Sequence, residues 1–242
     1  WSLPGHSWTL AKTLGNGKDP EPFVDRVSAL AFDPDGDRLL VGTGVPSRIG
    51  EISLWNTETW ETVATNDEAH DDTITSFAFS PDGSRFASGG TDQLVKIFET
   101  ATLTPVKTFE GHTSHVLDVD WNADDLTLAS AGADLQVKVW DLNQGQEKSK
   151  VEGFQKEVSS VVFVGSTDTL LTASGDMSLK LSNQPLPGAG VTFLHTADVS
   201  PDGKTIIAGG QDSVLRVWEA GSKQLLQSFP SPQTKEDGLA AE

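Results

Sequence analysis

Cysteine is absent from the 242-residue sequence. Disulfides, thiolate nucleophiles and zinc sites with cysteine ligands are therefore excluded. The absence does not identify a compartment, because a large β-sheet core is stable without disulfides.

Basic residues are scarce: the chain carries 17 Lys and Arg against 35 Asp and Glu, a formal net charge of −18. Nucleic-acid binding depends on Lys and Arg that neutralise phosphates, so the composition argues against a nucleic-acid partner. An acidic balance instead favours a basic protein or peptide partner.

Long apolar segments are also missing. The longest, residues 158–164, is far shorter than a membrane span, so membrane insertion is not expected. The sequence opens without a signal-peptide pattern, contains no Asn-x-Ser/Thr sequon, and begins with Trp1 rather than Met. Trp at residue 1 suggests a processed or excised piece, and the compartment and the oligomeric state stay open.

The most informative stretch runs from Val116 to Asp141. It contains three short runs of alternating apolar residues separated by two polar turns, with Gly111-His112 before it and Trp140-Asp141 at its end. A Gly-His before the first run and a Trp-Asp closing the third resembles one blade of a WD-repeat β-propeller.

The same pattern recurs along most of the chain. The first apolar residues of successive repeats lie 47, 42, 42 and 36 residues apart, near the ~40–45 residues of a four-stranded blade. Between these anchors the apolar residues alternate with period two, which indicates strands rather than helices. The anchors are Val27, Ile74, Val116, Val158 and Leu194.

Turn signals recur at one place in the repeat. Pro-Asp-Gly follows the first predicted strand at 34–36, 81–83 and 201–203. Proline presets φ, aspartate bonds its own backbone and glycine accepts a positive φ, so the triplet favours a tight hairpin.

We therefore expect an all-β fold, a WD40-type β-propeller with five recognisable four-stranded blades plus an orphan N-terminal outer strand within residues 1–14. A linker (15–22) would precede the blades, and 230–242 would form a flexible acidic tail. The family usually has seven blades, so the resemblance implies two more in the parent chain. The predicted blades cover about residues 23–66, 67–110, 111–152, 153–189 and 190–229.

Two repeats deviate from the pattern. The first carries an insertion of about four residues near 45–48, between its second and third strands. The fourth is short after Ser182 and leaves little room for an outer strand. We expect the edge of the fourth blade to be the weakest.

The resemblance places His112, Ser130, Asp134 and Trp140 on the four-residue hydrogen-bond network of this family. Asp134 is expected to accept from His112, which meets the Ser130 hydroxyl, which accepts the Trp140 indole N–H. A linked buried set of this kind rigidifies a blade. The other repeats keep only parts of the network: Trp55 in the first, His70, Ser88 and Asp92 with Phe98 in the second, Asp176 in the fourth, and Asp212 and Trp218 in the fifth.

Two catalytic or metal-binding alternatives use the same residues. His112, Ser130 and Asp134 have the residue types of a hydrolase triad, but Ser130 lies on a predicted mid-blade strand and has no G-x-S-x-G turn. His112 and His115 could share a metal, but His112 already has a place in the network. We expect no catalytic residue, no metal and no cofactor.

In WD-repeat proteins partners bind the loops around one end of the central channel, and the resemblance implies the same here. These loops lead into each blade or join its second and third strands; each can also be a plain solvated turn. Arg48 stands out, because extra loop length often signals function and its guanidinium suits a carboxylate. The other candidate partner-binding residues are Asp25, Asp71, Asp72, Gln93, Ser114, Leu135, Met177 and Ser213.

The favoured interpretation is a non-catalytic scaffold that binds a protein or peptide through these loops. A weaker resemblance, to the WD40 regions of bacterial multidomain c-type cytochrome-like proteins, implies an accessory binding module with upstream domains in an exported, redox-associated polypeptide. That protein would be periplasmic rather than cytoplasmic, although no haem motif is present. A propeller enzyme is the third alternative, and it would need a convergent His and acidic set that we do not find.

Overall fold

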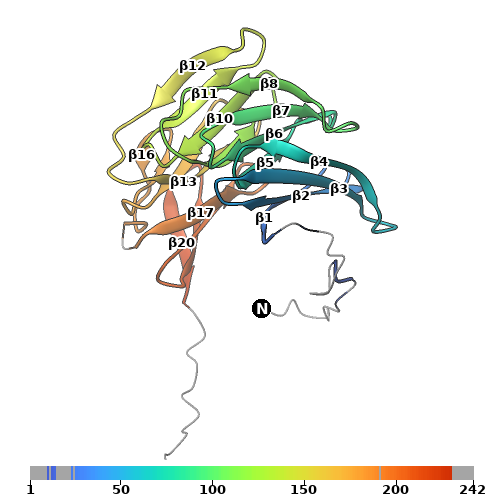
Figure 1. Cartoon of the computed structure of the whole chain (residues 1–242). Coiled ribbons are helices and arrows are strands. Elements are labelled where there is room, and N and C mark those ends of the chain that lie inside the picture. Colours follow the sequence, from blue (N-terminus) through green and yellow to red (C-terminus); the bar gives the residue numbers. More distant parts are fainter. Residues whose placement is uncertain (1–9, 11, 15–22, 24, 191, 231–242) are drawn as a thin grey trace, which may run out of the picture.

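The chain folds into five four-stranded antiparallel sheets (Figure 1). The computed structural model describes residues 10, 12–14, 23, 25–190 and 192–230. Within these residues there is no helix, and so none that is long and apolar enough to cross a membrane. The all-β blade architecture predicted from the repeats is confirmed.

Each sheet is one sequence repeat, and we call the sheets blades 1 to 5. The strands of a blade pair in sequence order, so short hairpins make every connection within it. The strands are β1 (Val27–Phe32), β2 (Arg38–Val45), β3 (Ile49–Asn56) and β4 (Thr62–His70) in blade 1; β5 (Ile74–Phe79), β6 (Arg85–Gly90), β7 (Val95–Glu99) and β8 (Pro105–Phe109) in blade 2; β9 (Val116–Trp121), β10 (Thr127–Gly132), β11 (Val137–Asp141) and β12 (Gln146–Val151) in blade 3; β13 (Val158–Phe163), β14 (Leu170–Ser174), β15 (Leu179–Leu181) and β16 (Gln184–Pro185) in blade 4; and β17 (Leu194–Val199), β18 (Thr205–Gly210), β19 (Leu215–Glu219) and β20 (Gln224–Phe229) in blade 5.

The first strands of the blades lie next to one another, β1 beside β5, then β9, β13 and β17. The remaining strands fan outward from them (Figure 1). The pairing of the first two strands shifts register at the same point in all five blades, one residue after the anchor. Such a bulge increases local twist.

The residue at this bulge joins neighbouring blades where it carries a hydroxyl. Ser28 donates to the carbonyl of Ile74 at 2.6 Å, Thr75 to Val116 at 2.8 Å, and Ser159 to Leu194 at 2.7 Å. Blades 3 and 5 have Leu117 and His195 at this position, so the same link cannot form there.

The hydrophobic core is divided among the spaces between blades. One cluster of buried side chains lies between each successive pair, and the largest members include Phe86 and Phe98 between blades 1 and 2, Trp140 between blades 2 and 3, and Trp218 between blades 4 and 5. Apolar burial at these faces holds the blades side by side.

The insertion of the first repeat lengthens two strands rather than a loop. β2 and β3 have eight residues each and stay paired as far as Val45 and Ile49, leaving a short turn. The longer hairpin crosses close to the loop before blade 2, where a Cβ on Gly44 would clash with Thr73 and one on Gly50 with Asp72. Glycine permits this close approach.

Blade 4 has a very short outer strand. β16 contains only Gln184 and Pro185 and pairs with two residues of β15. The predicted orphan strand, the linker and the acidic tail fall almost entirely outside the described residues. In blade 1, β4 continues to His70, beyond the predicted blade boundary at residue 66.

Candidate functional site: the loop face

Two sets of loops share one end of every blade, because alternate connections of an antiparallel sheet lie at the same edge. We call the loop before the first strand the leading loop and the turn between the second and third strands the upper turn. Together they form the loop face. The opposite end, which carries the Pro-Asp-Gly turns between the first and second strands, is the hairpin face.

In blade 3 a chain of hydrogen bonds connects the leading loop to the upper turn and the sheet. His112 Nδ1 lies 2.9 Å from Asp134 Oδ2, and His112 Nε2 lies 2.7 Å from Ser130 Oγ. The Trp140 indole N–H donates to the same Ser130 oxygen at 2.9 Å. The four side chains join the leading loop, β10, β11 and the upper turn into one unit.

The protonation of His112 follows from this geometry. Burial lowers the pKa of His112 below its ordinary value, against the opposing effect of Asp134. A neutral imidazole can donate from Nδ1 to Asp134 and accept the Ser130 hydroxyl proton at Nε2. Ser130 is fully buried, so its hydroxyl is not accessible to a substrate.

Blade 2 contains the same arrangement with phenylalanine in place of tryptophan. His70 Nδ1 lies 2.9 Å from Asp92 Oδ2, and His70 Nε2 lies 2.6 Å from Ser88 Oγ. The Phe98 ring stacks on Phe86 with 5.2 Å between centroids. The aromatic packing is kept, while one hydrogen bond to the serine is lost.

Blade 5 keeps Asp212 and Trp218 of the predicted network, and the two side chains have separate partners. Asp212 forms an ion pair with the buried Arg216. The Trp218 indole N–H donates instead to the carbonyl of Pro187 at 2.8 Å. Blade 5 has Ala208 where blades 2 and 3 have serine, so nothing there can bridge the two.

Blade 1 forms a small variant that the sequence did not suggest. The Trp55 indole N–H donates to Ser53 Oγ, two residues earlier on the same strand, at 2.8 Å. Serine and tryptophan are both on β3, so the bond does not join two strands as it does in blade 3.

The upper-turn aspartates fasten the leading loops through backbone amides. Asp92 accepts the N–H of Asp71 at 3.1 Å, Asp134 that of Thr113 at 3.0 Å, and Asp176 that of Gln155 at 2.9 Å. Hydrogen bonds from His70 and from backbone amides lower the pKa of Asp92 although burial acts to raise it. This clasp therefore depends on the aspartate and survives in blade 4 without a histidine.

Four candidate partner-binding residues occupy one equivalent position at the tips of the upper turns. Each has a left-handed backbone although none is glycine: Gln93 (φ 73°), Leu135 (φ 68°), Met177 (φ 72°) and Ser213 (φ 59°). A side chain at positive φ is uncommon and costs conformational energy. Leu135 is 38% exposed and Met177 46% exposed, so two adjacent blades present apolar side chains to solvent.

A cavity of about 310 Å³ lies beside Met177. Its walls come from the upper turn of blade 4 and the short β16, including Leu179, Pro185 and Ala189. The short outer strand therefore coincides with a hollow beside one of the two exposed apolar tips.

The remaining candidates lie around the first two blades. Asp72 accepts the Ser47 N–H at 2.9 Å and the Thr73 N–H at 2.7 Å; burial acts to raise the pKa of Asp72, but these bonds hold it below its usual range. Arg48, Asp25 and Asp71 are exposed and Ser114 is partly buried. The described residues contain no group of three His, Asp or Glu side chains placed to hold a metal ion.

The sequence reasoning missed an acidic pair on the innermost strand of blade 3. Asp118 accepts from the Ser76 hydroxyl at 2.7 Å and from the Val161 N–H at 3.0 Å, and Asp120 accepts from the Phe163 N–H at 2.6 Å. The equivalent position of Asp118 is Ala29 in blade 1. The signal available in the sequence was an aspartate at an inner-strand position where another blade carries an uncharged residue.

A repeated four-stranded blade with a His-Ser-Asp-Trp network defines the class of this protein as a β-propeller repeat protein. The family described as "WD40: WD domain, G-beta repeat" matches residues 60–99, 103–141 and 185–219. Over these three segments the chain is similar to WD-repeat proteins. Such proteins generally act as protein-interaction scaffolds and are generally not enzymes.

Three curated relatives are similar over parts of the chain. The Caenorhabditis elegans "Periodic tryptophan protein 2 homolog" is 34% identical over 94 residues, 39% of this chain and 10% of that protein. The Podospora anserina "Vegetative incompatibility protein HET-E-1" is 35% identical over 85 residues, 34% of this chain and 6% of its own length. An uncharacterised WD repeat-containing protein of Schizosaccharomyces pombe is 36% identical over 81 residues, 32% of this chain and 15% of its own length.

The matched region is thus a small part of each relative. All three relatives are eukaryotic, and none of their names mentions a cytochrome. The suggested likeness to bacterial cytochrome-like proteins has no support among them.

Proposed function

We propose that this protein is a non-catalytic scaffold that binds a polypeptide on its loop face, centred on the upper turns of blades 3 and 4. The observation that carries the proposal is the pair of exposed apolar tips, Leu135 and Met177, both held at positive φ. A solvated turn has no need of an apolar side chain in that conformation, whereas a binding surface uses one.

Three further features support this location. The cavity of about 310 Å³ beside Met177 can receive an apolar side chain. The clasps of Asp134 and Asp176 onto their leading loops hold the turns in place, which lowers the entropy cost of binding. The net charge of −18 favours basic residues in the bound segment.

A peptide-display selection tests the proposal. Peptides are selected on the protein from a random library, and their affinity is compared between the parent and the Leu135→Ser/Met177→Ser double variant. We expect selected peptides to carry apolar and basic residues and to lose at least about tenfold in affinity on the double variant, equivalent to ~1.4 kcal/mol.

The matched control is Val63→Ser/Val106→Ser, which removes two exposed apolar side chains from the outer strands β4 and β8. This control should leave the affinity unchanged. Peptides that bind the parent and the Leu135→Ser/Met177→Ser variant equally well would place the binding surface elsewhere.

A further inference from the structure

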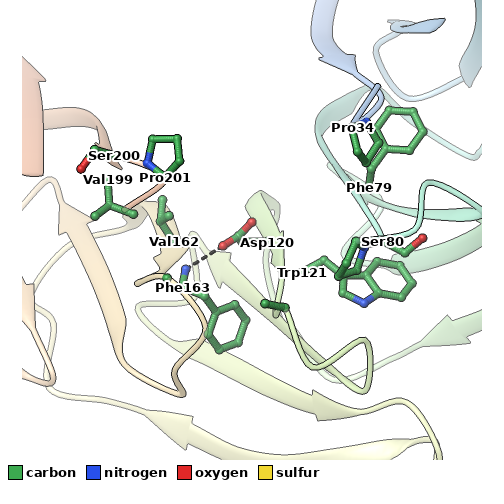
Figure 2. A pocket seen from close by; sticks show the side chains of 13 residues that line it. Pro34, Phe79, Ser80, Asp120, Trp121, Val162, Phe163, Val199, Ser200 and Pro201 are labelled. Atoms are coloured by element: carbon green, nitrogen blue, oxygen red, sulfur yellow. Dashed lines mark hydrogen bonds between the residues drawn. The ribbon is translucent and has the colours of Figure 1, made fainter. Parts of the chain in front are cut away.

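The hairpin face, opposite the loop face, contains its own cavity of about 360 Å³. Its walls come from all five blades. They include Pro34 of blade 1, Phe79 of blade 2, Val162 and Phe163 of blade 4, and Val199 and Pro201 of blade 5 (Figure 2). Blade 3 contributes Asp120, Trp121 and Ala123. The volume is at the lower end of the ~300–1,000 Å³ that ligand pockets span.

The walls are mainly apolar and rigid. Three of the lining residues, Pro34, Pro81 and Pro201, belong to the Pro-Asp-Gly turns, whose backbone is fixed by proline and by hydrogen bonds within each turn. Such walls suit the methylene stem of a long side chain, which gains from apolar contact while its charged end stays polar.

Asp120 is the acidic residue in the lining of this cavity. The Phe163 N–H donates to Asp120 Oδ2 at 2.6 Å and fixes the orientation of the carboxyl group, while the side chain keeps part of its surface open to the cavity (Figure 2). The charged groups that act on Asp120 most strongly are two further carboxylates, Asp118 on the same strand and Asp198 on β17.

Among the described residues, no cationic side chain forms an ion pair with Asp120. The inner strands β5 and β13 on either side carry no ionisable residue. Arg85, which lies over the Trp121 ring at 5.3 Å, is paired with Asp125, and neither residue lines the cavity. A deeply placed carboxylate surrounded by like charge gains most from an opposite charge supplied by a ligand.

We propose that this cavity is a binding site for a cationic side chain, an arginine or lysine presented by a partner polypeptide, with Asp120 as its counter-ion. The site is separate from the loop face and does not depend on the function proposed for that face. A metal ion is a poorer fit, because the described residues bring no three ligand groups together here.

The test uses a blocked, fluorescently labelled pentapeptide, Gly-Gly-Arg-Gly-Gly, and its citrulline analogue, which has nearly the same shape and no charge. We expect the parent to bind the arginine peptide at least about tenfold more tightly than the citrulline peptide, because a hydrogen bond between charged groups is stronger than one to a neutral group. Asp120→Asn should abolish this preference. Glu58→Gln, the same charge change on an exposed turn of blade 1, should retain it.

The pH dependence gives a second readout. Burial, together with Asp118 and Asp198, raises the pKa of Asp120 to about 7. Because the cation requires the ionised carboxylate, the parent should bind the arginine peptide about tenfold more tightly at pH 8 than at pH 6. The Asp120→Asn variant should bind equally weakly at both values.

A second variant keeps the test sharp if Asp120→Asn folds poorly. Ala123 is exposed and lies on the cavity wall, so Ala123→Trp should obstruct the cavity while the Asp120 carboxylate itself is kept. Loss of arginine-peptide binding in this variant supports the proposal. Unchanged binding in a folded Asp120→Asn protein, equal affinity for the citrulline peptide, or no binding by the parent overturns it.

Discussion

Ser130 serves two neighbours at once, because a hydroxyl accepts one hydrogen bond while it donates another. Trp140 donates to Ser130, and Ser130 faces the unprotonated nitrogen of His112. The direction of every bond in this chain is set by Asp134, which can only accept. Removing the aspartate therefore affects all four residues.

We expect Asp134→Ala to lower the free energy of unfolding by about 1–3 kcal/mol, the cost of leaving a buried polar group without its partner. The measurement is urea unfolding followed by tryptophan fluorescence. Asp37→Ala, the same change on an exposed turn, should stay within about 0.5 kcal/mol of the parent. Equal losses in both variants would mean that the network contributes nothing to stability.

Ionised Asp120 lowers the stability of the folded protein, and this effect depends on pH. The pKa is raised to about 7 in the folded protein from 3.8, so ionisation opposes folding as the pH rises through this window. Asp120→Asn should therefore be more stable than the parent at pH 8, by more than about 1 kcal/mol, and the difference should vanish near pH 4. Thermal unfolding at four pH values measures this, and a gain that is constant with pH would contradict it.

Among the elements, the upper turns share one backbone conformation at their tips but carry different residues there. A turn that needs positive φ is normally served by glycine, yet the equivalent tips of four blades carry Gln93, Leu135, Met177 and Ser213. The energetic effect of replacing them depends on what the side chain contacts.

Met177→Gly should raise the free energy of unfolding by about 0.5–1 kcal/mol, because glycine relieves the left-handed backbone at an exposed tip. Leu103 also has positive φ (53°) but is 1% exposed in the core between blades 1 and 2. Leu103→Gly should therefore destabilise by about 2–5 kcal/mol. Chemical denaturation gives both values, and the same sign for both would show that backbone strain is not the deciding factor at Met177.

The outer part of blade 4 should open more readily than that of blade 3. β16 pairs with two residues of β15, whereas β12 pairs with β11 over five positions. Hydrogen exchange measured by mass spectrometry should show residues 179–186 exchanging at least about tenfold faster than 137–151. Equal protection would mean that the short strand is held by contacts other than its ladder.

Strands were predictable from the sequence and strand lengths were not. Alternating apolar residues and Pro-Asp-Gly turns identify the hairpins, because both signals are local. The residues Val45 to Arg48 have the composition of a loop, but the β2–β3 ladder continues into this segment as far as Val45. Whether a polar hairpin end pairs or loops out depends on its contact with Thr73, a neighbour in the next blade that local patterns do not reveal.

At the scale of the whole molecule, the face of blade 1 that points away from blade 2 is only partly covered. Leu39, Val41 and Trp55 pack with Leu14 and Phe23. Nearer the centre, Leu30 is 61% exposed and Phe32 60% exposed. In blades 2 and 3 the residues equivalent to Phe32 are Phe79 and Trp121, and neither is as open to solvent.

The 242-residue chain should therefore associate at high concentration. Size-exclusion chromatography with light scattering is expected to show a mass that rises with concentration, and Leu30→Glu/Phe32→Glu should reduce the rise. Val63→Glu/Val106→Glu adds the same charge on outer strands and should not. A monomeric mass at all concentrations would contradict this expectation and show that the exposed apolar face does not drive association.

The candidate sites differ in how far the sequence could predict them. The residues of the blade 3 network follow from a repeat signature, so their contacts could be anticipated. Asp118 and Asp120 could not be interpreted in the same way, since their partners Ser76, Val161 and Phe163 belong to other blades. A cavity shared by blades far apart in the sequence exists only once the blades are arranged around a common centre.

The long β2–β3 hairpin makes blade 1 structurally distinct from the other blades on the loop face. Five similar blades would otherwise offer a docking partner several nearly equivalent rotations about the propeller axis. β2 and β3 have eight residues each where β6 has six and β7 five, so at ~3.3 Å per residue this hairpin is longer than that of blade 2 by roughly 7 Å. A polypeptide bound on the loop face would meet an extended hairpin at blade 1 and at none of the other four described blades, so the insertion would fix its orientation relative to the repeats.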